Sequence, residues 1–140
     1  MNIHRTSKSG LFLMELVLII LFFAITSAVC VNLFANAHLT SVAGKDLNKA
    51  VVEVQTAAEV VKHTKGDEER LAELLGAVRQ DKGMTVSYNQ DWEPIAENEQ
   101  PRYQLRIVST PGTDGMLYTE VEMHKGEALL YQITVGSYIG

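Results

Sequence analysis

An unbroken apolar stretch near the N-terminus dominates the hydrophobic pattern of the chain. Residues 11–34 read LFLMELVLIILFFAITSAVCVNLF and contain a single charged side chain, Glu15. At about 1.5 Å per residue, a helix of this length spans roughly 36 Å, which exceeds a hydrocarbon core of about 30 Å. The pattern therefore predicts a transmembrane helix over residues 11–37, preceded by a short leader, residues 1–10.

A second pattern, with apolar residues every three or four positions, continues the helix beyond the membrane segment. Its stripe consists of Ala43, Leu47, Val51, Val54, Ala58 and Val61, with Ala50 and Ala57 on the same side. Spacing of this kind is typical of a helix with one buried face. We place Asp46 with the charged residues that lie off this stripe. Because His63 and Gly66 suit a helix end, one helix is predicted over residues 11–63, with an amphipathic part over 38–63.

A shorter helix is predicted over residues 67–80. Asp67 suits its N-cap, and acidic residues at 68 and 69 suit the positive end of the helix dipole. Its apolar face would consist of Leu71, Leu74, Leu75 and Val78. We expect Lys82 and Gly83 to end it.

From residue 84 the pattern changes to the strict alternation that is typical of β-strands. Four runs follow it, with these apolar positions: Met84, Val86 and Tyr88; Tyr103, Leu105 and Ile107; Leu117, Thr119, Val121 and Met123; Leu129, Tyr131, Ile133 and Val135. Turn residues separate the runs at 94–101, 111–115 and 125–126. The alternation predicts a four-stranded antiparallel sheet over residues 84–136.

One apolar face of this sheet needs a cover, and the amphipathic stripe is the cover that the chain offers. The expected fold class is therefore α+β. A long N-terminal α-helix, its first half transmembrane, packs on a four-stranded antiparallel sheet with one short extra helix. Residues 38–140 form the extracytoplasmic domain in this interpretation.

The charge distribution sets the expected orientation and excludes one class of partner. The chain has a net charge of -5, and the leader carries Arg5 and Lys8 without an acid, so residues 11–140 have -5 - 2 = -7. By the positive-inside rule the N-terminus lies in the cytoplasm and the C-terminal domain outside a cell membrane crossed once. An acidic body without a basic stripe argues against nucleic acid as a partner.

Glu15 is the candidate functional residue of the apolar segment. A carboxylate costs about 2.5–3.5 kcal/mol at the centre of a membrane helix and less near the interface. Residues 11–37 contain no Lys, Arg or His. The partner of Glu15 must therefore come from another chain, from a new amino terminus or from water at the interface.

Two other interpretations of the N-terminal segment are a cleaved secretory signal and a plain signal anchor. Residues 35–37, ANA, have the pattern of a signal cleavage site. However, the apolar stretch is much longer than the roughly 7–15 residues of a signal core, and Glu15 is badly placed in such a core. A plain anchor gives no role to the carboxylate of Glu15 within the membrane helix.

The residues around Glu15 resemble a known processing site. Residues 9–16, SGLFLMEL, are similar to the prepilin site of type IV pilins and type II secretion pseudopilins. In that family a membrane peptidase cuts after a Gly that ends a basic leader, and it methylates the new amino terminus. The resemblance implies cleavage between Gly10 and Leu11, N-methylation of Leu11, and a role for Glu15, the fifth mature residue, in subunit assembly.

The resemblance also implies a function and partners. The chain would be a structural subunit of a type IV pilus, type II secretion or competence-type filament for protein transport. Its partners would be the prepilin peptidase, other pilin-like subunits, an inner-membrane assembly platform and membrane lipid. Leu11, Phe12 and Asn32 stand where many members have Phe, Thr and Pro, and Cys30 is the single cysteine. These departures favour a pseudopilin or minor pilin over a major fibre subunit.

No pattern of catalytic, cofactor-binding or metal-binding residues is found in the sequence, so we expect no enzyme, no cofactor and no metal. The histidines do not lie at metal-ligand spacing, and no phosphate loop or nucleophile motif occurs. Asp114 with Glu120 or Glu122 is a weak calcium candidate, and an ordinary turn is the preferred interpretation.

The alternative function is a single-pass membrane-anchored binding or adhesion module that is not assembled into a filament. Its contact candidates are the loops at residues 89–102 and 110–116. Trp92 would anchor a ligand in that case, whereas the preferred interpretation places its ring against the edge of the sheet.

Overall fold

The computed structural model describes residues 8–96 and 98–138, so residues 1–7 of the predicted leader lie outside the described residues. The helices are α1 (Lys8–Thr64) and α2 (Glu68–Leu75). The strands are β1 (Val78–Gln80), β2 (Gly83–Tyr88), β3 (Tyr103–Pro111), β4 (Met116–Lys125) and β5 (Ala128–Tyr138). The chain divides into two units, and the boundary falls inside α1 between Ala43 and Gly44. The predicted long helix is confirmed, and it begins three residues earlier than expected.

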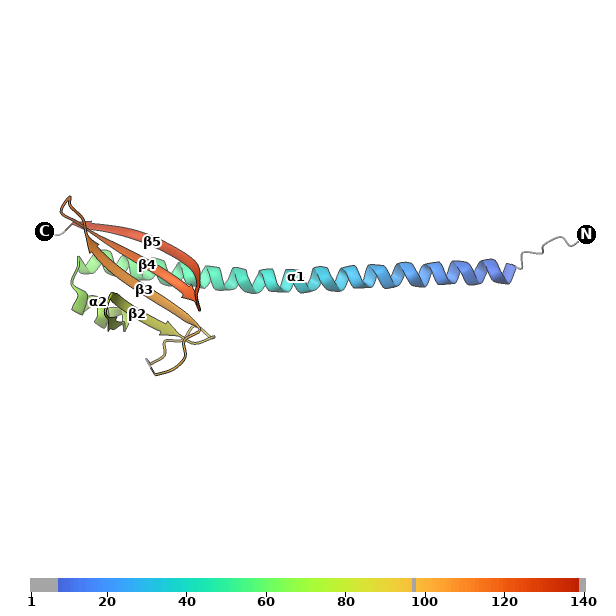
Figure 1. Cartoon of the computed structure of the whole chain (residues 1–140), viewed down its shortest axis with the longest axis horizontal. Helices are drawn as coiled ribbons and strands as arrows, with labels where there is room; N and C mark the ends of the chain where they lie inside the picture. Colours follow the sequence, from blue (N-terminus) through green and yellow to red (C-terminus); the bar gives the residue numbers. More distant parts are fainter. Residues whose placement is uncertain (1–7, 97, 139–140) are drawn as a thin grey trace, which may run out of the picture. The chain divides into compact units, whose positions relative to one another are not determined.

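Over the described part of the chain, five strands form one antiparallel sheet in the order β1-β2-β3-β4-β5. Figure 1 shows β2, β3, β4 and β5 side by side. Each strand pairs with its neighbours in sequence, so the sheet is a meander. Val121 in β4 pairs with Ile107 in β3 and with Ile133 in β5, so apolar residues form rows across the strands. The α+β class is confirmed, but the predicted number of four strands is wrong.

The fifth strand arises where the shorter helix was predicted to continue. Asp67 caps α2 as expected, because its carboxylate accepts a hydrogen bond from the backbone N–H of Arg70. The helix ends at Leu75, since Gly76 adopts a left-handed conformation (φ 61°) and donates its N–H to the carbonyl of Ala72. Val78 therefore lies in β1 rather than on a helix face. The prediction of a helix over residues 67–80 is wrong in its second half.

The buried stripe of α1 differs from the predicted one at its start. Its buried residues are Asp46, Ala50, Val54, Ala57, Ala58, Val61 and Thr64. Ala43 is exposed, and Leu47 keeps 44% of its surface exposed. The prediction that Asp46 lies off the stripe is therefore wrong. The stripe that faces the sheet is rotated by about one residue at this end of the helix.

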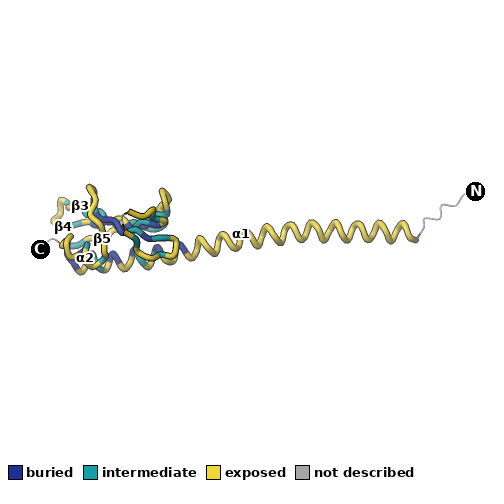
Figure 2. Tube along the Cα trace, turned by 90° about the horizontal axis from the view of Figure 1, so that it is seen from below, coloured by how far each residue is buried: buried dark blue, intermediate teal, exposed yellow. Residues whose placement is uncertain are grey.

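The inner face of the sheet follows the predicted alternation in β2, β3 and β4. Its buried residues are Met84, Val86, Tyr88, Tyr103, Leu105, Ile107, Thr119, Val121, Met123 and, in β5, Val135. In Figure 2 the buried positions appear in the strands and in the last part of α1. Together with Leu71 of α2 and the apolar residues of the α1 stripe, they form one hydrophobic core.

A β-bulge reverses the alternation at the start of β5. Met123 pairs with Tyr131, but the next residue of β4, His124, pairs with Leu129. Leu130 is thus an extra residue, and it packs against the core, while Leu129 remains 49% exposed. The prediction that Leu129 faces the core is wrong, because an inserted residue shifts the side-chain period by one position.

Gly83 provides a test of the close contact between β2 and β3. Its φ is 142°, and a Cβ atom there would overlap the backbone carbonyl of Ile107. We expect Gly83→Ala to lower the free energy of unfolding by about 1–3 kcal/mol. Chemical unfolding of the full chain in detergent, followed by Trp92 fluorescence, measures the change.

The matched control for this substitution is Gly44→Ala in α1. A Cβ atom at Gly44 has no neighbour within 4 Å, and the residue is helical. This variant should be neutral or more stable by up to about 1 kcal/mol, because Ala has the higher helix propensity. Equal free energies of unfolding for the two variants would contradict the close β2–β3 approach.

Candidate functional site

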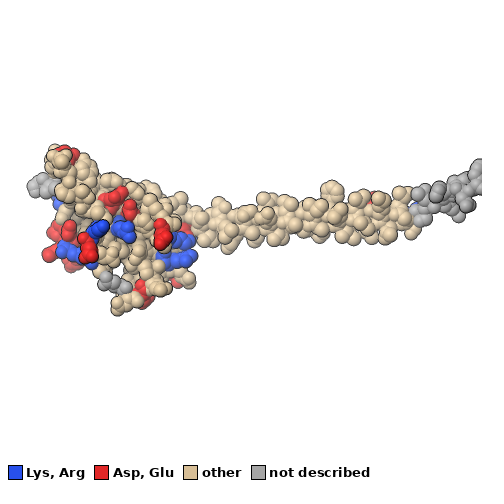
Figure 3. Space-filling model, viewed as in Figure 1, with Lys and Arg blue, Asp and Glu red and all other residues tan. Residues whose placement is uncertain are grey.

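The N-terminal unit presents its apolar side chains to the surroundings. Every described residue from Lys8 to Lys45 is exposed, and Phe22, Phe23 and Phe34 are 73%, 73% and 78% exposed. The space-filling view shows almost no charged atoms along this part of α1 (Figure 3). Within the described residues, α1 is the one helix long and apolar enough to cross a membrane.

Several polar side chains of this segment form hydrogen bonds to other groups of α1. The hydroxyl of Thr26 donates to the carbonyl of Phe22 at 2.8 Å, and that of Thr40 donates to the carbonyl of Asn36 at 2.9 Å. The side-chain amide of Asn36 donates to the side-chain oxygen of Asn32 at 3.1 Å. Groups bonded in this way do not require water, which suits a helix in an apolar environment.

The three predicted site residues lie in the first turns of α1. Because the helix begins at Lys8, the Gly10–Leu11 peptide bond lies within the first turn rather than before the helix. Leu11 and Glu15 are four residues apart, so their side chains lie on the same side of the helix. Both are exposed, Leu11 to 60%. The structure thus brings the candidate cleavage bond and the candidate assembly residue onto one short helical segment.

Glu15 is the one acidic residue between Lys8 and Lys45. Among the described residues, none forms a side-chain hydrogen bond or an ion pair with its carboxylate. The first turn of α1 contains no acidic residue, so Glu15 also lies beyond the reach of the helix N-terminus. The carboxylate is an acceptor on an apolar surface and is available to a cation from outside the chain.

A second charged group, Asp46, lies in the C-terminal unit and was not foreseen. Its residue surface is 8% exposed. One carboxylate oxygen accepts a hydrogen bond from the hydroxyl of Tyr103 at 2.9 Å, and the other accepts one from the Lys125 ammonium at 2.5 Å. These contacts link α1 to β3 and β4. Asp46 precedes Ala50 by four residues, and this spacing is the sequence signal that could have placed it on the stripe.

Aromatic stacking extends the group around Asp46 to the loop between β2 and β3. The ring of Trp92 stacks on Tyr103 with centroids 3.9 Å apart and planes at 16°, and the Lys125 ammonium lies 5.6 Å from the Tyr103 centroid. The side-chain oxygen of Asn89 accepts the backbone N–H groups of Asp91 and Glu93. Trp92 is half-buried against the core, so it holds this loop on the domain.

The electrostatics of this group follow from its partners. Burial raises the pKa of Asp46, but the hydrogen bonds from Lys125 and Tyr103 and the positive charges of Lys125 and Arg102 together outweigh burial, so the pKa lies below its usual value. Burial and the hydrogen bond to the Asp46 carboxylate raise the pKa of the Tyr103 hydroxyl. The carboxylate is therefore charged and the phenol neutral at neutral pH, as the hydrogen-bond directions require.

The candidate calcium residues are engaged with other side chains. The Asp114 carboxylate accepts a hydrogen bond from the Tyr118 hydroxyl at 2.7 Å. The Glu122 carboxylate lies 2.8 Å from Nε2 of His124 and forms a hydrogen bond with it. The carboxylate of Glu120 accepts a hydrogen bond from Gln132 at 2.7 Å. In the described portion of the chain, no three His, Cys, Asp or Glu side chains converge as they would around a metal ion. Asp114 lies in the turn between β3 and β4.

The pH dependence of stability tests the Asp46 contacts. Because folding lowers the pKa of Asp46, its contribution is present above the unfolded value of about 3.9 and is lost as the pH falls through the folded value. We expect Asp46→Asn to be less stable by about 1–3 kcal/mol at pH 7 and to differ little from the wild type near pH 2. Chemical unfolding across this range measures the difference.

The control is Glu59→Gln, which removes an exposed acid from the same helix. Its stability should follow the wild type at every pH. If Asp46→Asn lowers the free energy of unfolding by the same amount from pH 7 to pH 2, then the contribution of Asp46 to stability comes from the shape of its side chain and not from its charge.

No protein-family model, no curated protein and no solved structure matches the chain. The functional assignment therefore rests on the residues and the geometry described above.

Proposed function

We propose that this chain is a single-pass, membrane-anchored structural subunit of the pilin-like kind, either a pseudopilin or a minor pilin. The observation that carries the proposal is Glu15. A carboxylate stands on the fully exposed apolar surface of α1, and no described residue pairs with it. An acid in this position is expensive in lipid and marks a functional site.

The membrane topology in this proposal follows from the charges that flank the apolar segment. Arg5 and Lys8 precede it, and the acidic residues other than Glu15 follow it. The N-terminus then faces the cytoplasm, and the unit from Gly44 onward lies outside the membrane. Cleavage after Gly10 removes the basic residues and creates an amine on Leu11.

The new amine would supply the partner that Glu15 lacks. In a bundle of parallel α1 helices, the ammonium of Leu11 of one subunit meets the carboxylate of Glu15 of its neighbour. Each charge alone would be buried without compensation, whereas the pair compensates both. Because the two groups lie on one short segment of α1, only subunits with a small axial offset make the contact. The pair thus selects the register of assembly.

The partners in this proposal are the prepilin peptidase, an inner-membrane platform and other pilin-like subunits of a pilus, secretion or competence-type filament. The α+β unit outside the membrane would decorate the helical bundle. It has a closed hydrophobic core that contains residues of α1, α2 and the sheet. Each subunit would therefore bring a folded outer domain, and the exposed part of α1, residues 8–45, would form the bundle.

Substitution of Glu15 tests the charge pairing. We expect Glu15→Ala to insert and to be cleaved like the wild type, but to enter filaments about a hundredfold less, because the Leu11 amine of the neighbour stays unpaired. Sheared filament fractions and membrane fractions, compared by immunoblot, measure this ratio. Glu59→Ala is the matched control, since it removes an exposed acid outside the apolar segment.

The outcomes for Glu15 separate the two anchored alternatives. Normal incorporation of Glu15→Ala would rule out charge pairing as the basis of assembly. Absence of the wild-type chain from every filament fraction would favour an anchored binding module instead.

The intact mass of the protein from membranes tests the processing step. We expect the loss of residues 1–10 and the gain of one methyl group on Leu11. Retention of Met1 would identify a simple anchor, and a chain that starts after Ala37 would identify a secreted protein.

A further inference from the structure

A hollow of about 620 Å3 lies beside the turn between β1 and β2. Its lining includes Gln80, Asp81, Lys82, Thr85, Arg106 and Val108. Leu105 and Ile107 of β3 face the core, so Arg106 and Val108, which alternate with them, face the opposite side of the sheet. The hollow is thus open to solvent on the side away from the core. Its volume is in the range of small-molecule sites.

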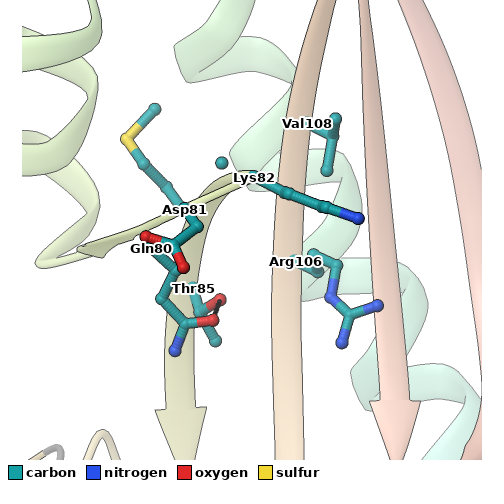
Figure 4. A pocket seen from close by; sticks show the side chains of 8 residues that line it. Gln80, Asp81, Lys82, Thr85, Arg106 and Val108 are labelled. Atoms are coloured by element: carbon teal, nitrogen blue, oxygen red, sulfur yellow. Dashed lines mark hydrogen bonds between the residues drawn. The ribbon is translucent and has the colours of Figure 1, made fainter.

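Two cations dominate one side of this hollow. In Figure 4 the side chains of Lys82 and Arg106 extend on the Val108 side, whereas Asp81 lies on the side of Gln80. Among the described residues, neither Lys82 nor Arg106 has a carboxylate within the 4.0 Å of an ion pair. Two cations of the same unit do have such a partner among the described residues, Arg79 with Glu68 and Lys125 with Asp46.

The acid nearest in register to Arg106 is already engaged. Glu122 in β4 is the cross-strand partner of Arg106, but its carboxylate bonds to the ring of His124 at 2.8 Å. The hydroxyl of Thr85 donates to the side-chain oxygen of Gln80 at 3.3 Å. This contact turns the acceptor of Gln80 toward Thr85 and leaves its amide N–H groups for another partner.

The backbone holds these groups in place. Gly83 brings β2 so close to β3 that a Cβ atom would lie 3.2 Å from the Val108 side chain. Lys82 lies in the turn that ends at Gly83, and β2, which follows this turn, pairs with the strand that carries Arg106. A guanidinium fork, an ammonium and an amide donor on one concave surface are the groups that bind an oxyanion.

We propose that this hollow binds an oxyanion, either a phosphate group or a carboxylate, through Arg106 and Lys82. The Arg106 fork accommodates two oxygens, Lys82 supplies a second positive charge, and Gln80 donates from its amide. Val108 provides an apolar wall for the group that carries the anion. The site lies in the outer unit and is independent of the proposed assembly role of Glu15.

Titration of the full chain in detergent micelles tests this site. Inorganic phosphate is added at constant ionic strength, and the amide signals of Gly83 and Thr85 and the side-chain N–H of Arg106 are followed by nuclear magnetic resonance. We expect saturable shifts. Arg106→Gln and Lys82→Gln should each weaken binding about tenfold, because each removes a charge-assisted contact.

The control variant is Lys49→Gln, which removes one exposed positive charge from α1 and leaves the hollow intact. It should bind phosphate like the wild type. Two results would overturn the proposal: chemical shifts that grow without saturation, or a loss of phosphate affinity in Lys49→Gln as large as that in Arg106→Gln and Lys82→Gln. Either result would mean that phosphate responds only to the overall charge of the protein.

A second titration identifies the source of the anion. The probe is a capped peptide of three glutamates, added under the same conditions to the same variants. Tighter binding of phosphate supports a free or lipid-borne phosphate as the ligand. Tighter binding of the peptide supports a carboxylate of a partner protein, and failure of both probes overturns the site.

Discussion

The burial of one stripe of α1 against the sheet is the interaction on which the outer unit depends. From Asp46 onward, α1 supplies small and β-branched residues to a core that the sheet closes from the other side. Before Lys45, the same helix has apolar residues on all sides, and the described ones are exposed. A helix that is apolar all round needs lipid or other helices, whereas a single stripe needs only one covering layer. The two units of the chain follow from this difference.

The two units differ in whether a key carboxylate has a partner within the described part of the chain. Asp46 is buried, and Tyr103 and Lys125 satisfy it from two strands. Such a group costs desolvation and is tolerated because its partners belong to the same chain. No described residue pairs with the Glu15 carboxylate, and in the proposed function the amine of a neighbouring subunit compensates its charge. We therefore expect Asp46 to stabilise the fold, whereas Glu15 is the basis of the proposed assembly function.

The early end of α2 creates the surface that carries the second proposal. Gly76 stops the helix, the chain returns as β1, and the turn into β2 places Lys82 beside Arg106. A helix that continued to residue 80 would have removed both the fifth strand and the hollow. One residue in a left-handed conformation thus decides the shape of this edge of the sheet.

The sequence by itself determined the features that depend on local periodicity and composition. These are the long helix, the alternation in β2, β3 and β4, the N-cap at Asp67 and the placement of Gly10, Leu11 and Glu15 in one apolar segment. Local signals suffice there, because each residue is judged against neighbours a few positions away. The tertiary structure decided the rest. The pairing of Asp46 with Lys125, the bulge at Leu130 and the gathering of Lys82 with Arg106 join residues on different elements. Their contacts depend on strand register and on the rotation of α1 against the sheet, which no local pattern specifies.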